Sequence, residues 1–236
     1  MDKKVVLIDG FSILFRAFYG LPRLSNSKGV PTNAIYGFLN IMFKIIDEET
    51  PDYLVIAFDT DKPTFRHDMY EEYKGTRKPT PEELVTQIPM VKEILLTMDI
   101  AIVEKDGYEA DDIIGTLSKK ADKDGNRVTV VSGDKDLLQL ATDKIKIRIP
   151  KTKSTGTEIE DYFAKDVKEK YQVTPKEFID VKGLMGDPSD NIPGVPGIGV
   201  KTATKLIVEY GSIENAHDNI EEVKPKRAKE SLKENY

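Results

Sequence analysis

Acidic residues crowd into one short segment of the chain, GYEADDIIGT, which runs from Gly107 to Thr116. Glu109, Asp111 and Asp112 lie there within four residues, just where an apolar run begins. Carboxylates this close repel one another unless something positive lies between them. The segment therefore predicts a cation site, with capping of a helix start by acidic residues as the alternative.

The elements that must position these acids alternate between strand and helix. Apolar runs rich in β-branched residues predict buried strands at residues 3–9, 53–59, 100–105 and 127–134. Helical periodicity between them predicts helices at residues 33–48, 80–98 and 109–123. Such alternation is typical of parallel strands joined by right-handed crossovers. We therefore predict an α/β fold, with a central, mostly parallel, twisted sheet flanked by helices.

Further acids follow each predicted strand. The carboxyl ends of parallel strands meet at one edge of a sheet, where ligands bind. Seven acids between positions 9 and 136 should therefore converge, and two more from the segment MGDPSDN could join them. The nine candidates are Asp9, Asp59, Glu109, Asp111, Asp112, Asp134, Asp136, Asp187 and Asp190. A helix-capping role accounts for any single one of them, but it accounts poorly for seven coincident positions.

The kinds of side chain available indicate which cation such a site would hold. Its ligands would be oxygens, because the chain has no cysteine and its two histidines, His67 and His217, lie far from the strand ends. Oxygen ligands favour Mg²⁺ or Mn²⁺ over Zn²⁺. Mg²⁺ usually takes one or two carboxylates, so nine candidates predict two or more ions. Two metals ~4 Å apart suit in-line phosphoryl chemistry, in which water is activated and the leaving oxygen stabilised.

Composition excludes several other classes of protein. The length of 236 residues indicates one large domain, or one domain with a smaller appendage. No apolar run reaches the ~18 residues of a membrane span, and the lack of cysteine excludes a disulfide framework and a thiol nucleophile. We therefore expect a cytoplasmic protein.

The net charge of −6 argues against a nucleic-acid partner. When the nine candidate acids are left out, however, the other 32 Asp and Glu are set against 35 Lys and Arg, which gives a net charge of +3.

Some of that positive charge is clustered in KIKIRIPKTK, residues 144–153. Lys144, Lys146 and Arg148 alternate with isoleucines, so they share one face of a predicted strand. Solvated lysines on an edge strand are one interpretation. No acid lies within the run to balance it, so we expect a strip that faces phosphates.

The character of the sequence changes after residue 150, and residues 160–219 have helical patterns. Within them, IPGVPGIGVKTATKLI (192–207) predicts a glycine-rich hairpin between two helices. Free backbone N–H groups at a helix start can bind an anion, and Lys201 and Thr202 add side-chain donors. The glycine order and the lack of a preceding strand exclude a dinucleotide fingerprint. An ordinary tight turn remains the alternative.

A second mixed segment, KPTFRHDMYEEYKGTRKP (62–79), follows Asp59 and combines basic with aromatic residues. This combination suits phosphate contacts and base stacking. On this stretch alone, an amphipathic helix with a solvated charged face is favoured.

Five segments together resemble the 5′ nuclease (flap endonuclease) superfamily, most closely the N-terminal 5′→3′ exonuclease domains of bacterial DNA polymerases I. They are LIDGFSILFRAF, AFDTDKPTFRHDMYEEYKGTR, GYEADDIIGTL, SGDKDLLQL and LMGDPSDNIPGVPGIGVKTA. The resemblance implies a PIN-like 5′ nuclease fold and a metal-dependent enzyme that cuts DNA near a 5′ junction. Such an enzyme leaves 5′-phosphate products and serves primer removal and repair.

The resemblance also implies roles for particular residues. The nine acids would hold Mg²⁺ or Mn²⁺, and Arg66, Tyr73, Lys74 and Arg77 would lie in an arch or gateway for the 5′ strand. Of these four, the three basic residues would assist catalysis and Tyr73 would contact DNA. Gly194, Gly197 and Gly199, with Lys201 and Thr202, would form a helix–hairpin–helix that grips duplex DNA, in this family often with K⁺.

The expected organisation is a nuclease core at residues 1–150, with the arch around 62–79. A helical region follows at 151–236, with the helix–hairpin–helix around 183–209, the whole forming one compact unit. The expected partners are branched, nicked or 5′-flapped duplex DNA and a polymerase domain on a longer chain, without membrane contact. We expect a monomer that is cytoplasmic and associated with the nucleoid.

Some features depart from the family pattern. Phe11 stands where close relatives often carry serine, and DTDKP is an unusual loop after Asp59. The chain also stops before the family's last nuclease helices and before any polymerase domain, so we expect either an excised piece or an abbreviated nuclease.

Two other functions remain open at this point. A haloacid-dehalogenase-type phosphatase is suggested by VIAFDTDKP, although in that family the DxD strand comes first, whereas here a whole strand–helix unit precedes it. A non-catalytic module that binds DNA junctions would use the acids only as helix caps. Metal-dependent cutting of a flapped duplex distinguishes the nuclease from both.

Overall fold

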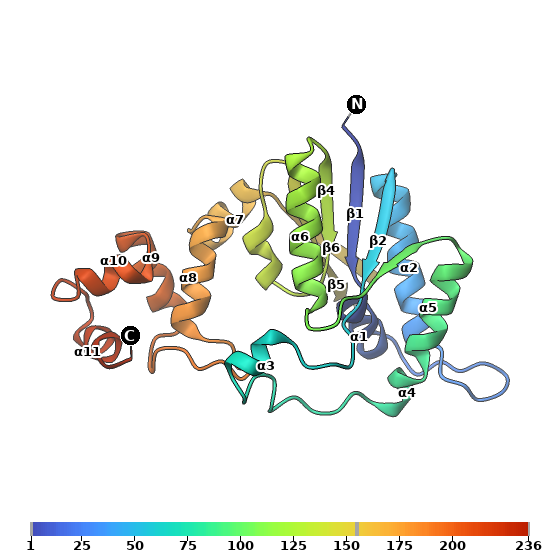
Figure 1. Ribbon diagram of the computed structural model, residues 1–236, viewed down its shortest axis with the longest axis horizontal. Helices are drawn as coiled ribbons and strands as arrows, with labels where there is room; N and C mark the ends of the chain where they lie inside the picture. The colour runs from blue at the N-terminus through green and yellow to red at the C-terminus, as the bar shows by residue number, and fades with distance from the viewer. Residues whose placement is uncertain (1, 154–155, 236) are drawn as a thin grey trace. The chain divides into compact units, whose positions relative to one another are not determined.

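The computed structural model describes residues 2–153 and 156–235, with the side chains of 152–157 outside the description (Figure 1). The chain divides into two compact units. The first comprises Met1–Phe65 and Pro79–Phe163, and the second comprises Arg66–Lys78 and Ala164–Tyr236. The segment expected to form the arch thus belongs largely to the unit that holds the predicted hairpin.

The first unit is built on a six-stranded sheet in the order β3-β2-β1-β4-β5-β6. The strands are β1 (Lys4–Asp9), β2 (Tyr53–Ala57), β3 (Ala101–Val103), β4 (Arg127–Val131), β5 (Ile145–Lys153) and β6 (Gly156–Tyr162). All neighbours pair in parallel except β5 and β6, which are antiparallel. This confirms the predicted, mostly parallel α/β sheet.

The strand order reverses beside β1, which has β2 on one side and β4 on the other. At such a switch point the connections leave in opposite directions, so a crevice opens at the carboxyl ends of the two strands. In this unit, the carboxyl ends of β1 and β4 border that crevice. Asp9 ends β1, and the segment Ser132–Asp136 follows β4.

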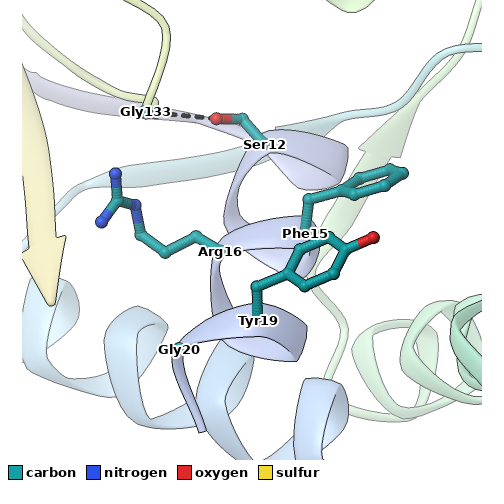
Figure 2. A pocket seen from close by; sticks show the side chains of 6 residues that line it. All are labelled: Ser12, Phe15, Arg16, Tyr19, Gly20 and Gly133. Carbon is teal, nitrogen blue, oxygen red and sulfur yellow. Dashed lines mark hydrogen bonds between the residues drawn. The ribbon is translucent and has the colours of Figure 1, made fainter. Parts of the chain in front are cut away.

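The helices of the first unit cover the sheet. They are α1 (Gly10–Gly20), α2 (Asn33–Glu49), α4 (Glu82–Val85), α5 (Gln87–Thr97) and α6 (Ala110–Lys123), followed by a 3₁₀ turn, η1 (Asp136–Leu140). Helix α1 carries Ser12, Phe15, Arg16 and Tyr19 (Figure 2). The helix predicted at 80–98 is two helices, since Thr86 separates α4 from α5. The apolar core lies between β1, β2, α1 and α2, where Ile8, Leu14, Phe38 and Ile56 are fully buried.

The second unit is helical. Its elements are α3 (Phe65–Met69, begun by the last residue of the first unit), α7 (Ala164–Tyr171), α8 (Pro175–Met185), α9 (Val200–Tyr210), α10 (Ile213–Asp218) and α11 (Lys226–Glu234). Helix α8 begins with a capping box: Glu177 N–H donates to Thr174 Oγ1 at 3.3 Å, and Thr174 N–H donates to Glu177 Oε2 at 2.7 Å. No described helix of either unit is long and apolar enough to cross a membrane.

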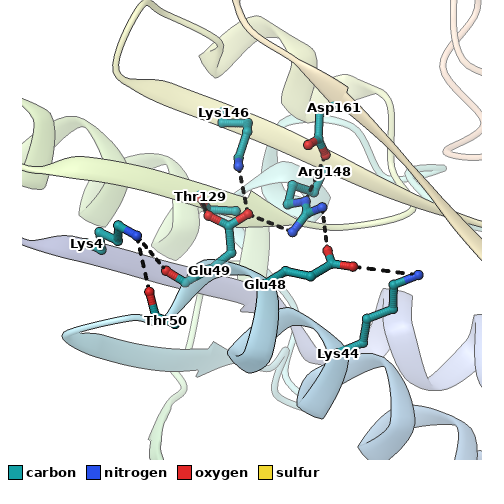
Figure 3. Close-up of polar contacts among 9 residues, drawn as sticks. All are labelled: Lys4, Lys44, Glu48, Glu49, Thr50, Thr129, Lys146, Arg148 and Asp161. Carbon is teal, nitrogen blue, oxygen red and sulfur yellow. Dashed lines mark hydrogen bonds and ion pairs between the residues drawn. The ribbon is translucent and has the colours of Figure 1, made fainter.

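The structure corrects two expectations about residues 144–162. Strand β6 occupies part of the segment expected to be helical, and the expected boundary at residue 150 falls inside β5. The basic residues of β5 also do not form a phosphate-facing strip, because β5 lies between β4 and β6. Arg148 is 7% exposed and pairs with Glu48, Glu49 and Asp161 at 2.7, 2.6 and 2.8 Å (Figure 3). The acids that balance the charge of Arg148 come mainly from α2, which lies about 100 positions earlier in the sequence.

Glu49 is the centre of this polar network. Its carboxylate accepts from Lys146 at 2.7 Å, from Arg148 at 2.6 Å and from Thr129 at 3.0 Å (Figure 3). Burial opposes its ionisation, but these bonds and the charges of Lys146 and Arg148 outweigh burial and hold the pKa of Glu49 below its usual value. Glu49 therefore joins α2 to strands β4 and β5.

We expect Glu49→Gln to lower the free energy of unfolding at pH 7 by about 1–3 kcal/mol, because it leaves buried Arg148 less well paired. The folded pKa is depressed, so the stabilisation is present above the unfolded pKa and is lost as pH falls through the folded one. Urea unfolding at pH 7 and pH 3 measures both effects. Glu48→Gln is the control, since Glu48 is more exposed and should matter by less than about 1 kcal/mol. If Glu49→Gln lowers the free energy of unfolding as much at pH 3 as at pH 7, the charge-based account is wrong.

Candidate active site

Asp9 lies at the centre of the candidate site. It ends β1 and caps α1, with backbone φ −75° and ψ 103° outside the helical range. Its Oδ1 accepts from the Ser12 N–H at 3.0 Å, and its Oδ2 accepts from the Ser132 hydroxyl at 2.8 Å. The side chain is buried, so both carboxylate oxygens are held in place within the sheet edge.

Other carboxylates surround Asp9. Burial raises the pKa of Asp9 to about 6; hydrogen bonds from Ser12 and Ser132 partly offset this, and the charges of Asp59 and Asp134 raise it further. Burial also raises the pKa of Asp111 well above its usual value, with added repulsion from Asp9, Asp134, Asp59 and Glu109. Five predicted acids, from the carboxyl ends of β1, β2 and β4 and from the start of α6, therefore lie within reach of one another's charge.

Several of the same acids also cap backbone groups, as the alternative interpretation expected. Asp112 Oδ2 accepts from the Glu109 N–H at 3.0 Å, which completes a capping box at the start of α6. Asp59 Oδ1 accepts from the Ala110 N–H at 2.6 Å. Asp134 Oδ1 accepts from the N–H of Asp136 at 2.8 Å. Capping and cation binding are therefore not exclusive here, because a carboxylate has about four lone-pair sites and one hydrogen bond occupies only one of them.

The donor set fits a hard divalent cation. Buried, mutually repelling carboxylates are stabilised by a positive charge, and oxygen donors match Mg²⁺ and Mn²⁺. Over residues 2–153 and 156–235, no three His, Cys, Asp or Glu side chains are gathered closely enough to form a complete ligand set. Repulsion between like charges opposes a closer approach of these carboxylates.

Asp187 and Asp190 belong to the second unit and have cationic partners within it. Asp187 accepts from Lys182 at 2.6 Å; although partial burial opposes ionisation, this bond and those from Ser189 lower the pKa of Asp187 to about 2. Asp190 accepts from the Tyr73 hydroxyl at 3.1 Å and pairs with the Arg77 guanidinium. These two acids therefore tie the 66–78 segment and the end of α8 into one unit.

The remaining residues of the predicted arch lie in the same segment. Lys74 has a left-handed backbone (φ 56°), and its N–H donates to the Asp190 carbonyl at 2.9 Å. Its ammonium lies 5.1 Å from the centre of the Tyr73 ring. Arg77 also donates to the Ser189 carbonyl at 3.1 Å, and Arg66 lies in α3. Tyr73 is buried, whereas Arg77 is exposed.

The predicted hairpin between α8 and α9 is present in the second unit. A Cβ at Gly194 would lie 2.2 Å from the Met185 carbonyl carbon, so only glycine allows the hairpin to pack this closely on the end of α8. Gly197 has φ +76°, and Gly199 caps α9. Lys201 is exposed and Thr202 half-buried in the first turn of α9. The hairpin therefore presents backbone N–H groups beside a basic side chain at a helix start.

Sequence reasoning missed a pocket on α1. Ser12, Phe15, Arg16, Tyr19, Gly20 and Gly133 line an open pocket of about 410 Å³ (Figure 2). The Gly133 N–H donates to Ser12 Oγ at 2.7 Å, and within the described residues Arg16 Nε has no hydrogen-bond partner. The signal was the helical spacing of positions 12, 15, 16 and 19, which puts a hydroxyl, a guanidinium and two rings on adjoining faces. Ser12 connects this pocket to Asp9.

Comparison with known proteins agrees with this fold. Residues 4–172 match the 5′-3′ exonuclease N-terminal resolvase-like domain, and residues 173–236 match the 5′-3′ exonuclease C-terminal SAM fold. The chain is 54% identical over 232 residues to DNA polymerase I of Bacillus subtilis and 51% identical over 234 residues to that of Bacillus caldotenax. These matches cover 98% and 99% of this chain but 26% of each relative, so the chain spans about a quarter of their length.

A solved structure shows the same fold. A bacteriophage T5 flap endonuclease, in a pseudo-enzyme–product complex with DNA and metal ions, matches with a TM-score of 0.77 and 26% identity. The match covers 98% of this chain and 84% of that one. Because the two family profiles together account for residues 4–236, the chain belongs to the 5′-3′ exonuclease family.

Proposed function

We propose that the chain is a divalent-metal-dependent, structure-specific 5′→3′ exonuclease and 5′-flap endonuclease, which hydrolyses DNA phosphodiester bonds near a 5′ junction and leaves 5′-phosphate products. The observation that carries this proposal is the set of coupled carboxylates around Asp9, at the switch point of a parallel sheet. Perturbed carboxylates in such a crevice mark functional sites. Membership of the exonuclease family supports the same activity.

The carboxylates proposed to hold Mg²⁺ or Mn²⁺ are, in the first unit, Asp9, Asp59, Glu109, Asp111, Asp112, Asp134 and Asp136. The chemistry that two such ions supply is activation of water and stabilisation of the leaving oxygen. The protein's own part is to hold several carboxylates near one another at the sheet edge, where burial and mutual repulsion raise the pKa of Asp9 and of Asp111 and a bound cation would favour their ionised forms. We include Asp187 and Asp190 as further candidates whose carboxylates are already balanced by Lys182 and Arg77.

DNA binding is proposed at three places, each described within its own unit. The α1 pocket offers the Arg16 guanidinium to a phosphate and the Phe15 and Tyr19 rings to an unstacked base. The hairpin at 194–199, with Lys201 and Thr202, suits sequence-independent contacts to duplex phosphates, and K⁺ is proposed as its ion. Lys74, Arg77 and Arg66, with Tyr73, are proposed to contact the 5′ strand.

The structure also bears on the two alternatives. A haloacid-dehalogenase-type phosphatase would use Asp59, the first acid of VIAFDTDKP, as its nucleophile, but Asp59 follows β2 rather than the first strand, and its Oδ1 accepts from the Ala110 N–H at 2.6 Å. A binding module that uses acids only as caps has no reason to place buried Asp9 and half-buried Asp111 beside other carboxylates, because doing so costs stability. Both observations favour the nuclease.

The decisive experiment is incubation with a 5′-labelled flap duplex. We expect short products in Mg²⁺ or Mn²⁺, none in excess EDTA, and no metal-dependent phosphate release from small phosphate esters. Product length separates exonucleolytic from flap cutting. Undiminished cleavage in EDTA would rule out the metal-dependent mechanism, and binding of the flap without cleavage in any metal would favour the junction-binding module.

The relatives are DNA polymerases I, of which this chain matches 26%. We propose that the nuclease works beside a polymerase on a longer chain and acts as a monomer on nicked or branched DNA at the nucleoid.

A further inference from the structure

Two serines join the end of β1 to the loop after β4. The Ser132 hydroxyl donates to Asp9 Oδ2 at 2.8 Å and accepts from the N–H of Asp134 at 3.0 Å. Across the same crevice, Ser12 N–H donates to Asp9 Oδ1 at 3.0 Å, and Ser12 Oγ accepts from the Gly133 N–H at 2.7 Å. We call these four hydrogen bonds the serine clasp.

The clasp bonds to the carboxylate of Asp9 and to the backbone of Asp134, two residues at the carboxyl ends of the neighbouring strands β1 and β4. Ser132 is fully buried and Asp9 is 6% exposed, so water does not replace these bonds. The two chain segments are more than 120 positions apart, yet their polar atoms meet within hydrogen-bonding distance at two points. Hydrogen bonds to Asp9 and to the backbone of Asp134 oppose the repulsion that would drive these two acids apart.

We propose that Ser132 is a positioning residue that sets the orientation of Asp9 and its spacing from Asp134 for a divalent cation. The inference rests on the proposed metal-dependent function. The hydroxyl proton points to Asp9 Oδ2, so the other lone pairs of that carboxylate remain directed for cation binding. Partners that orient a ligating side chain typically change metal affinity by about 10- to 100-fold when removed.

The two serines should differ in importance. Ser132→Ala removes the side-chain donor to Asp9 and the acceptor for the Asp134 N–H together. Ser12→Ala keeps the backbone N–H that bonds to Asp9 Oδ1 and loses only the acceptor for Gly133. We therefore expect Ser132→Ala to have the larger effect on cation binding. Ser118→Ala is the matched control, because Ser118 is equally buried in the same unit but donates to a carbonyl of its own helix.

The test measures Mn²⁺ binding to the full chain by titration calorimetry without DNA, beside single-turnover flap cleavage at varied Mg²⁺. For Ser132→Ala we expect Mn²⁺ affinity to fall by about 10- to 100-fold and the Mg²⁺ concentration for half-maximal cleavage to rise by a similar factor. DNA affinity in EDTA should be unchanged, and the thermal midpoint should move no more than in Ser118→Ala. Ser132→Thr, which keeps the hydroxyl, should restore most of the Mn²⁺ affinity.

Wild-type Mn²⁺ affinity in Ser132→Ala, or an equal loss in Ser118→Ala, would overturn the proposal. If Ser132→Ala is too unstable to titrate, Ser132→Cys, a weak donor of similar size, provides the same comparison. Failure of the proposed function has a different signature: a wild-type protein that binds Mn²⁺ in a Ser132-dependent manner but leaves the flap duplex intact. A wild-type protein that binds no Mn²⁺ would overturn both.

Discussion

Replacing Asp111 with alanine is expected to slow single-turnover cleavage of a 5′-flap duplex by about 100- to 1,000-fold at saturating Mg²⁺. Several kcal/mol of transition-state stabilisation come from a correctly held metal, and each ~1.4 kcal/mol is a factor of ten in rate. Asp111 lies among four other carboxylates, so it is well placed to share a cation with them. Rapid-quench kinetics measure the effect, with Asp122→Ala, which lies near the other end of α6, as the control.

The same change separates chemistry from binding. With EDTA present, Asp111→Ala should bind the flap duplex as tightly as wild type or more tightly, because one fewer unpaired carboxylate repels the phosphates. Fluorescence anisotropy checks this. A variant that cuts at near wild-type rate would remove Asp111 from the ligands, and a variant that merely loses DNA affinity would indicate a misfolded sheet edge.

Asp111→Asn should in addition stabilise the metal-free protein. The pKa of Asp111 is raised in the folded state, so its protonated form is favoured by folding and stability is lost as pH rises through the folded pKa. Asparagine resembles the uncharged form, so its thermal midpoint should exceed that of wild type at pH 8 and approach it near pH 3. Added Mg²⁺ should narrow the gap at pH 8 by stabilising wild type more. A lower thermal midpoint for Asp111→Asn than for wild type at pH 8 would show that the neighbouring carboxylates do not repel Asp111.

The strands that the sequence predicted well are those buried on both faces. β1 and β4 are continuous apolar runs because helices cover both sides of a parallel sheet, and their composition alone identifies them. β6, with the sequence GTEIEDY, is an antiparallel strand at the sheet edge and carries polar residues among few apolar ones. Its pairing with β5, rather than its own composition, makes it a strand.

The candidate site was predictable in outline because sheet geometry dictates where strand ends meet. The sequence alone does not show which carboxylate oxygens bond to backbone N–H groups, as those of Asp59 and Asp112 do, since this depends on how α6 starts. Ser132 escaped notice for a similar reason: its partner Asp9 is 123 positions away. The charge of Arg148 was misread because Glu49 reaches it from another element. The sequence pattern therefore could not predict which side chains pair when their residues lie far apart in the chain.

A division of labour between Lys74 and Lys201 is the second large effect that we expect. Lys74 is held by its backbone bond to Asp190 and lies against the Tyr73 ring, so its ammonium has a defined position in the 66–78 segment. We propose that it opposes negative charge that grows on the scissile phosphate. A positioned donor of this kind typically contributes about 100- to 1,000-fold in rate. Lys74→Ala should therefore slow single-turnover cleavage at saturating enzyme by about 100-fold, with DNA affinity little changed.

Lys201, in contrast, is exposed in the first turn of α9, beside the hairpin N–H groups, where it suits phosphates that do not react. Lys201→Ala should weaken duplex binding, flatten the slope of log affinity against log salt by about one unit, and nearly keep the saturated rate. Lys205→Ala, one turn further along α9, is the control and should change the slope less. Binding titrations at several salt concentrations, run beside single-turnover kinetics, distinguish the two roles. The reverse pattern, in which Lys74→Ala loses only affinity and Lys201→Ala only rate, would show that the hairpin rather than the 66–78 segment serves the chemical step.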